Sequence, residues 1–340
     1  MSVALYDIVI PTIGRSSLHE LLASLASLIV PTRGRILMVD DRIDGAAPLA
    51  HAQRWWSDDD PVEILRSDGR GPAAARNVGW RAATAAWVVF LDDDVRVPDW
   101  WSIALERDLR GMPTDVAGSQ GQIRVPFPRD RRPTDWERNV AGLEHARWAT
   151  ADMAYRRTVL ERVGGFDERF PRAYREDADL ALRALETGRI VQGSRVIQHP
   201  VRPADRWVSV RLQRGNEDDA LMSVLHGRGW REAAGALPGR RRRHAAVVGL
   251  AIFAAAAALA GWWRVSLAFG AAWAAVTAEL TWARIAPGPR SRSEVSTMVV
   301  TSVVIPWVAI VHWVRGAIRA RLVVGRSVAK LVPRPAVQER

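Results

Sequence analysis

Short apolar runs alternate with amphipathic stretches over the first hundred residues. Four of these runs predict strands, at residues 7–11, 35–39, 61–65 and 87–91. Between them, leucines at helical spacing predict a helix at residues 16–29, and a proline in the first turn supports another at 72–86. The run at 87–91, WVVFL, is wholly apolar and predicts a central, buried strand. This alternation predicts a parallel, doubly wound sheet that binds ligands at the carboxyl ends of its strands.

The pattern becomes less regular after residue 110. Residues 111–150 are rich in proline, glycine and arginine and predict loops and short strands. Beyond them, helices are predicted at residues 158–163, 176–187 and 207–225, and a short strand at 196–199. The first 230 residues are therefore predicted to form one α/β domain.

Three long apolar stretches follow a basic segment, PGRRRR, at residues 238–243. They occupy residues 245–263, 265–283 and 295–314. Each approaches the ~20 residues that a membrane-spanning helix needs. Core helices of a soluble protein are the alternative, which flanking arginines and terminal tryptophans disfavour. We interpret 231–244 as a basic juxtamembrane linker and 245–340 as membrane-associated helices with a basic tail.

The number of membrane crossings follows less directly from the pattern. Basic residues gather at 240–243, at 284–292 and at 315–330. Three crossings would place the tail opposite the first basic segment, against the tendency of positive charge to stay in the cytoplasm. An even number of crossings, with one segment in the interface or re-entering, fits better. We therefore expect a multi-pass or hairpin anchor in the cell membrane.

The charge of the chain is distributed unevenly. Residues 231–340 hold 16 basic and 4 acidic side chains, whereas residues 1–230 hold 32 and 33. The net charge of +11 thus flanks the apolar stretches, which favours a membrane surface and lipids as partners over nucleic acid. The absence of cysteine excludes disulfides and thiolate metal sites. The first eleven residues lack the features of a signal peptide, so we expect a cytoplasmic catalytic domain.

Acidic and polar side chains follow the predicted strands. Thr12 ends the first strand, Asp40 and Asp41 end the second, and an aspartate triplet at 92–94 ends the fourth. A later helix begins with Glu176-Asp177. Converging carboxylates repel one another, so a divalent cation that is bridged by diphosphate oxygens would explain why they gather.

The sequence resembles glycosyltransferase family 2, an inverting family of the GT-A fold. The resemblance rests on IVIPTIGR, LMVDD, GPAAARNVGW, VVFLDDDVRVP, ADMAYRRTVLERVGGFDERF and REDADLALRALETG, in this order over about residues 6–200. It implies a mixed, mainly parallel sheet flanked by helices, a nucleoside-diphosphate sugar as donor, and Mn²⁺ or Mg²⁺ as cofactor.

The resemblance also assigns the donor and metal residues. It implies that Asp94 ligates the metal, that Asp92 helps through the ribose or a metal-bound water, and that Asp93 lies on the donor side. Asp41 and Thr12 match positions near the nucleobase. An acidic turn after a strand, and capping of the following turn by Asp41, are the structural alternatives for these residues.

Further residues follow from the same motifs. Arg76 and Asn77 either face the donor from the start of a helix or only tie that helix to the strand-end loops. His199 matches the place of a third metal ligand, against a purely structural histidine. Arg211 and Arg214 on the following helix are candidates to meet the diphosphate.

The remaining motif concerns the acceptor side. By resemblance, Asp177 is the general base and Glu176 is its neighbour, with an acidic pair at a helix start as the alternative. Gly164 and Gly165 would let the backbone approach the acceptor sugar. The QxxRW motif of processive members is replaced by RLQRGNEDDALM, which favours transfer of a single sugar.

These features predict a transferase that moves one sugar to a membrane-linked or cell-envelope glycan acceptor. A second hypothesis is a non-catalytic nucleotide-sugar sensor or membrane scaffold, which the intact acidic clusters disfavour. A third is a nucleotidyltransferase, for which a glycine-rich, basic loop is expected directly after the first strand, where this chain has TIGRSS.

Overall fold

A computed structural model describes residues 4–44, 49 and 62–331 of the chain. It divides into two compact units. The first comprises residues 1–128, 137–203 and 233–236, and the second comprises residues 129–136, 204–232 and 237–340.

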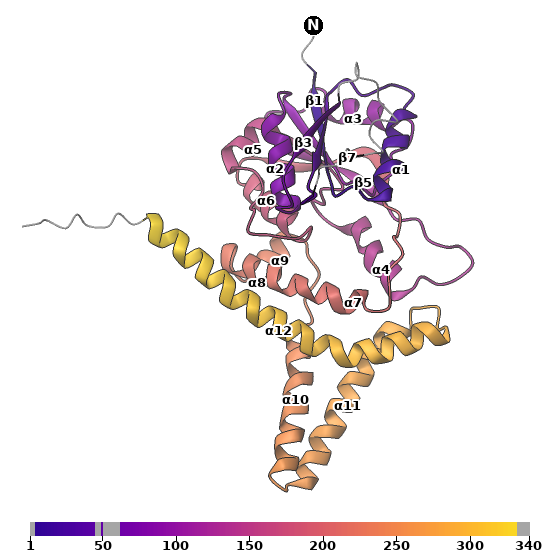
Figure 1. Cartoon of the computed structure of the whole chain (residues 1–340), viewed down its shortest axis with the longest axis vertical. Helices are drawn as coiled ribbons and strands as arrows, with labels where there is room; N and C mark the ends of the chain where they lie inside the picture. The colour runs from indigo at the N-terminus through magenta and orange to yellow at the C-terminus, as the bar shows by residue number, and fades with distance from the viewer. Residues whose placement is uncertain (1–3, 45–48, 50–61, 332–340) are drawn as a thin grey trace, which may run out of the picture. The chain divides into compact units, whose positions relative to one another are not determined.

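The first unit is built on a seven-stranded sheet (Figure 1). Its strands are β1 (Tyr6–Thr12), β2 (Ile36–Asp40), β3 (Val62–Arg66), β4 (Trp87–Leu91), β5 (Val116–Arg124), β6 (Asp152–Arg156) and β7 (Arg189–Gln198). Their spatial order is β3-β2-β1-β4-β6-β5-β7. Only β6 runs against its neighbours β4 and β5, so the sheet is mixed and mainly parallel. This confirms the predicted fold class.

Helices join these strands. They are α1 (Ser16–Ala26), α2 (Pro72–Ala82), α3 (Trp101–Leu109), α4 (Asp135–Ala141), α5 (Arg157–Val163) and α6 (Glu176–Leu185), with a 3₁₀ turn η1 at Gly142–His145. Every residue of β1, β2 and β4 is buried, as expected of strands that are covered on both faces. Leu18, Leu21, Leu22 and Leu25 bury the leucine face of α1.

The predicted elements up to β4 agree with the structure to within a few residues, although Pro61 lies outside the described residues. Residues 111–150, predicted as loops and short strands, contain the nine-residue strand β5 and the helix α4. The predicted four-residue strand at 196–199 is the end of the ten-residue β7. Helix α3 and strand β6 were not predicted. Polar residues inside β5 and β7 hid the strand pattern, because their partners lie on distant segments.

A buried arginine holds this second half of the sheet together. Arg195 of β7 is 0% exposed and donates from Nε to Asp152 of β6 (2.7 Å). Its Nη atoms reach Asp108 of α3 (3.2 Å) and both the carbonyl and the hydroxyl of Ser119 of β5 (2.6 and 3.0 Å). Trp101 Nε1 donates to the other oxygen of Asp152 (2.9 Å). The charges are thus paired and hydrogen-bonded, as burial requires.

The second unit is helical. It contains α7 (Val208–Arg211), the 3₁₀ turn η2 (Leu212–Arg214), α8 (Gly215–Leu225), α10 (Arg241–Leu259), α11 (Trp263–Ile285) and α12 (Arg292–Leu331), while α9 (Trp230–Ala233) crosses the division. The single helix predicted at 207–225 is therefore broken at η2. Helices α10, α11 and α12 match the three apolar stretches and are long and apolar enough to cross a membrane. Helices α10 and α11 lie side by side as a hairpin, and α12 runs across it (Figure 1).

Candidate active site

The three carboxylates of the aspartate triplet after β4 each contact different partners. The middle one, Asp93, is buried and accepts a hydrogen bond from the Thr12 hydroxyl (2.7 Å) and a weaker one from Arg15 (3.3 Å). Burial raises the pKa of Asp93, although the Thr12 hydroxyl and Arg15 oppose the shift. Thr12 and Asp93 therefore fasten β1 to β4. Their predicted contacts with the donor stay a prediction.

The third carboxylate faces a histidine and an arginine from the segment after β7. Asp94 Oδ1 lies 3.4 Å from Nε2 of His199, and Asp94 Oδ2 lies 3.2 Å from Arg202. The backbone N–H of His199 donates to the carbonyl of Arg124 at the end of β5 (2.8 Å), which fixes the start of this segment. The structure thus brings together two residues, 105 positions apart, that the family resemblance selects as metal ligands. Arg202 was not predicted, and only its place three residues after the histidine could have suggested it.

The pair formed by Asp94 and His199 has the chemistry of a small metal site. Within residues 4–44, 49 and 62–331, no three His, Asp or Glu side chains lie close enough to hold a metal. A divalent ion at a phosphate site needs only one or two protein ligands, because substrate phosphates and water supply the others. The Nδ1 atom of His199 is buried without a hydrogen-bond partner. A carboxylate beside an imidazole nitrogen therefore fits Mn²⁺ or Mg²⁺.

A buried arginine joins the first carboxylate of the triplet to Glu176, the neighbour of the predicted base Asp177. Arg76 of α2 is 2% exposed and donates to Asp92 Oδ1 (2.7 Å) and to Glu176 Oε1 (2.8 Å). Its Nε and the Oε2 of Glu176 are buried without partners. In this structure Arg76 therefore connects the turn after β4 with the start of α6, and its guanidinium is covered by protein.

The start of α6 holds the acidic pair in an unusual environment. Burial raises the pKa of Glu176, and the charge of Asp177 adds to the effect. Burial also raises the pKa of Asp177 above 3.8. The N–H of Ala178, which donates to Asp177 (2.7 Å), and the charge of Arg76 lower it. Arg175 precedes the pair with φ of 76°, a strained conformation for a residue other than glycine. Raised carboxyl pKa values and backbone strain are both typical of functional sites.

The aspartate after β2 lies at the start of α2. Asp41 accepts hydrogen bonds from the hydroxyl of Ser67 (2.7 Å) and from the backbone N–H of Gly71 (3.0 Å). This geometry agrees with the structural alternative for Asp41, and its contact with a nucleobase stays a prediction. The neighbouring Asp40 is buried and bound by Arg42, which lowers its pKa.

The glycine pair after α5 packs against α2. A Cβ atom on Gly165 would lie 2.3 Å from Nε1 of Trp80 and 2.5 Å from Oδ1 of Asn77. Asn77 also donates to the carbonyl of Phe166 and accepts from its N–H, each at 2.9 Å. Asn77 thus ties the helix to this loop, and the close approach at Gly165 is to α2, while its acceptor role stays a prediction. Gly164 has open space beside it, and its acceptor role stays a prediction.

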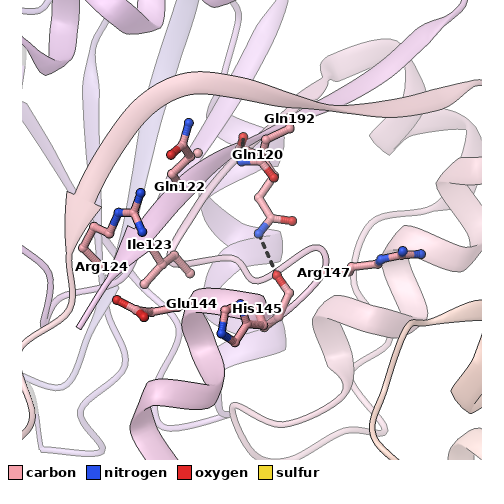
Figure 2. Close-up of a pocket in the computed structure, with 10 residues that line it drawn as sticks. Gln120, Gln122, Ile123, Arg124, Glu144, His145, Arg147 and Gln192 are labelled. Atoms are coloured by element: carbon pink, nitrogen blue, oxygen red, sulfur yellow. Dashed lines mark hydrogen bonds between the residues drawn. The ribbon is translucent and has the colours of Figure 1, made fainter.

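A polar pocket of about 170 Å³ lies beside β5 (Figure 2). It is lined by Gln120, Gln122 and Arg124 of β5, Gln192 of β7, and the turn at 144–147. Gln120 donates to the Ala146 carbonyl (2.9 Å), the bond drawn in Figure 2, and Gln192 donates to the Gln120 carbonyl (2.9 Å). Figure 2 shows the Arg147 side chain pointing away from the glutamines. No residue of this pocket was predicted from the sequence.

The pocket borders two other features of the first unit. The carbonyl of Arg124, at one end of its lining, accepts the backbone hydrogen bond of His199. At the other end, Arg147 lies against Gly235, where an added Cβ would be 2.6 Å from the arginine Cδ. Residues 233–236 lead along the chain to the arginines before α10.

Arg211, predicted to meet a diphosphate, pairs with Asp205 (2.9 Å) and lies with Arg214 in the second unit. Their contact with the donor stays a prediction.

Comparison with known proteins places the chain among glycosyltransferases. The model of the family described as glycosyl transferase family 2 matches residues 7–179, just over half of the chain. Two curated proteins from two strains of Mycobacterium tuberculosis, both named pre-mycofactocin glycosyltransferase, are 30% identical to it over 179 residues. The match covers 49% of this chain and 37% of each relative, so the chain corresponds to only part of their length. Among solved structures, mannosyltransferase PcManGT from Pyrobaculum calidifontis, in complex with GDP-Man and Mn²⁺, is similar with a TM-score of 0.53 and 19% identity. That similarity covers 93% of this chain and 88% of that one.

Proposed function

Since this chain belongs to glycosyl transferase family 2 and has the GT-A fold, we propose that it transfers one sugar from a nucleoside-diphosphate sugar to an acceptor hydroxyl, with inversion. The observation that carries the proposal is the network through Arg76. It links Asp92, in the triplet after β4, to Glu176 beside Asp177. This link between Asp92 and Glu176, which are 84 positions apart in the chain, supports one site that contains both acidic motifs.

The chemistry assigned to the protein is general base catalysis. An acceptor hydroxyl attacks the anomeric carbon while Asp177 takes its proton, and the bond to the nucleoside diphosphate breaks with its electron pair on the diphosphate. A raised pKa suits this role, because a base is most effective when its pKa lies nearer the working pH. Asp177 is only partly buried, whereas Glu176 is covered. We therefore assign the proton transfer to Asp177.

Asp94 and His199 would hold Mn²⁺ or Mg²⁺, which supplies positive charge to the departing diphosphate when it is bound. The comparison structure with GDP-Man and Mn²⁺ supports a divalent metal. Arg202, which contacts Asp94, adds a positive charge at the same place. We propose that Arg76 acts as a positioning residue beneath the donor, because its guanidinium is buried between two carboxylates.

We propose that the polar pocket beside β5 contacts the acceptor. Amide and guanidinium groups suit a polyhydroxylated ligand, because amides both donate and accept hydrogen bonds and a guanidinium donates several. The pocket is next to the carbonyl that holds His199 and next to the segment that leads to α10. An acceptor carried by a membrane, either lipid-linked or a cell-envelope glycan, would agree with the apolar helices of the second unit. The chain is then anchored in the cell membrane by its apolar helices, with the catalytic domain in the cytoplasm.

The test is a screen of nucleoside-diphosphate sugars with the purified full chain. We expect at least one donor to raise the melting temperature and to be turned over slowly in Mn²⁺ or Mg²⁺, and to lose both effects in EDTA. Asp94→Asn should lose them as well, whereas Asp99→Asn, an exchange outside the contacts of the site, should keep them. A donor that stabilises the protein but is never turned over, with any acceptor extract, would indicate a sensor. Stabilisation that survives EDTA would contradict the metal assignment.

A further inference from the structure

Helix α12 is the most apolar of the three candidate membrane spans, yet it differs from the other two in what it contacts. Within the candidate stretches, 33% of α12 is buried inside the protein, against 17% of α10 and 11% of α11. Helices α7, η2 and α8 all pack against α12. Hydropathy alone would make α12 a third crossing, whereas its packing against α7, η2 and α8 is that of a helix on a protein surface.

One side of α12 carries the polar contacts. Thr301 and Ser302 are buried there, and both of their hydroxyls accept hydrogen bonds from Arg284 at the end of α11 (2.8 and 3.1 Å). The same guanidinium donates to Asp135 (2.8 Å) and to Ser209 of α7 (2.9 Å). This side of α12 is therefore fixed to a charged, hydrogen-bonded layer of protein.

The contact with α8 continues along the helix. His312 pairs with Glu217 of α8. An added Cβ on Gly316 would lie 2.4 Å from the Cα of Glu217, so the two backbones touch. Helix α8 begins GNEDD and carries three acidic side chains in its first turns. If α12 crossed the membrane, these groups would have to enter the hydrocarbon with it, at a cost of about 2.5–3.5 kcal/mol for each charge.

The opposite side of α12 is apolar and exposed. Apart from Val299, its exposed apolar side chains recur every three or four residues, at Val300, Val303, Trp307, Val311, Val314, Ile318 and Leu322. This spacing places them in one stripe along the helix. Exposed arginines at 315, 319 and 321 accompany the stripe near its end. An apolar stripe with flanking arginines is the pattern of a helix that lies in a membrane interface.

We propose that α12 lies along the cytoplasmic surface of an anionic bilayer, with the stripe in the headgroup and acyl boundary and the α8 side toward the cytoplasm. Helices α10 and α11 are then the pair that crosses. This arrangement keeps the basic residues at 240–243, 284–292 and 315–330 on one side, where anionic lipids attract them. The bilayer is favoured over a second protein copy because the arginines match the charge of its headgroups. The inference rests on the proposed membrane attachment and is independent of the proposed catalysis.

The absence of cysteine makes the test direct. Single cysteines are introduced as Gly261→Cys in the turn between α10 and α11, Ser291→Cys before α12, and Arg321→Cys near its end. Each full-length variant is treated with a membrane-impermeant maleimide in sealed vesicles of both orientations. We expect residues 291 and 321 to react from the cytoplasmic side and residue 261 from the other side. Labelling of 291 and 321 from opposite sides would show that α12 crosses and would overturn the proposal. So would labelling of all three from one side.

A second measurement identifies what covers the stripe. Spin labels are attached to Val303→Cys and Val311→Cys in the stripe, with Arg315→Cys beside it as the control. In anionic vesicles we expect oxygen, which concentrates in lipid, to relax the stripe labels more than a water-soluble nickel complex does, and the control label to show the reverse preference. Broadening between labels of two chains at Val311→Cys would identify a second copy and would overturn the proposal. Neither experiment depends on sugar transfer, so failure of the topology and failure of the catalytic proposal are distinguished.

Discussion

Two buried arginines lie in the first unit, one in each half of its sheet. Each binds two carboxylates, but their hydrogen bonding is satisfied to different degrees. Arg195 binds two carboxylates and uses Nε and both Nη atoms, together with the carbonyl and hydroxyl of Ser119. Arg76 also binds two carboxylates, yet its Nε is unpartnered, as is one oxygen of Glu176. Both side chains are nearly inaccessible to solvent. The satisfied network joins three strands, and the incomplete one lies beside the aspartate triplet and the strained Arg175.

The comparison suggests that incomplete pairing distinguishes a site from a structural network. Buried polar groups without partners cost stability, so a protein that keeps them has a reason to do so. Around Arg76 the unpartnered atoms lie between the triplet after β4 and the acidic pair at the start of α6, the two parts of the proposed catalytic site. Around Arg195 the network is complete, and its role is to hold β5, β6 and β7 in register.

The largest expected effect on stability is at Arg195. Arg195→Met would leave Asp108 and Asp152 buried without their cation, and we expect a loss of about 3–5 kcal/mol in the free energy of unfolding. The matched control is Arg189→Met on the same strand, whose pair with Asp115 is exposed and should contribute little to stability. Denaturant unfolding measures both. Equal losses in the two variants would contradict the structural role of Arg195.

Arg76→Met should lose less stability than Arg195→Met and more transfer activity. Glu176 has a pKa that burial has already raised, so it can take up a proton when the arginine is removed, and we expect only about 1–3 kcal/mol of lost stability. Transfer should fall about 100-fold, because the base and the triplet lose their shared support. Unfolding and initial rates are measured on the same preparation. A variant that loses as much stability as Arg195→Met, with normal specific activity when folded, would remove the distinction between the two arginines.

A smaller loss of stability is expected at Gly165. Both Gly164 and Gly165 have positive φ, yet only Gly165 has neighbours where a Cβ would be placed. We expect Gly165→Ala to destabilise the protein by about 1–3 kcal/mol more than Gly164→Ala does. Thermal unfolding of the pair gives the difference directly. If the Gly164 variant alone lost acceptor affinity, the predicted contact of that glycine with the acceptor would gain support.

The pH dependence of transfer sharpens the role of Arg76 further. Asp177 must be ionised to accept a proton, and burial raises its pKa, so the rate should fall on the acid side at a pH above the ordinary aspartate value of 3.8. The charge of Arg76 lowers the pKa of both Asp177 and Glu176, and its removal must therefore raise them. We expect the acid limb of Arg76→Met to move to higher pH. An unchanged profile would mean that Arg76 does not act on the base.

The sequence predicted the fold well where one periodicity dominated. Trp87–Leu91 is a wholly apolar strand, and its bounds are those of β4. It failed where polar residues are paired across large distances, as at Ser119 and Arg195, because burial there depends on partners that lie 76 positions away. The same limit applies to the site. The motifs select Asp94 and His199, which the structure places together, but they could not show that Arg76 is buried or that Arg202 reaches Asp94.

The most direct test of the proposed site is transfer by Asp177→Asn, compared with wild type at saturating donor, metal and acceptor. The substitution keeps the size of the side chain and removes its ability to take a proton. We expect the donor to bind in a metal-dependent manner as in wild type, while the transfer rate falls by about 10²–10⁴-fold. A variant that binds donor and transfers sugar at the wild-type rate would contradict the account.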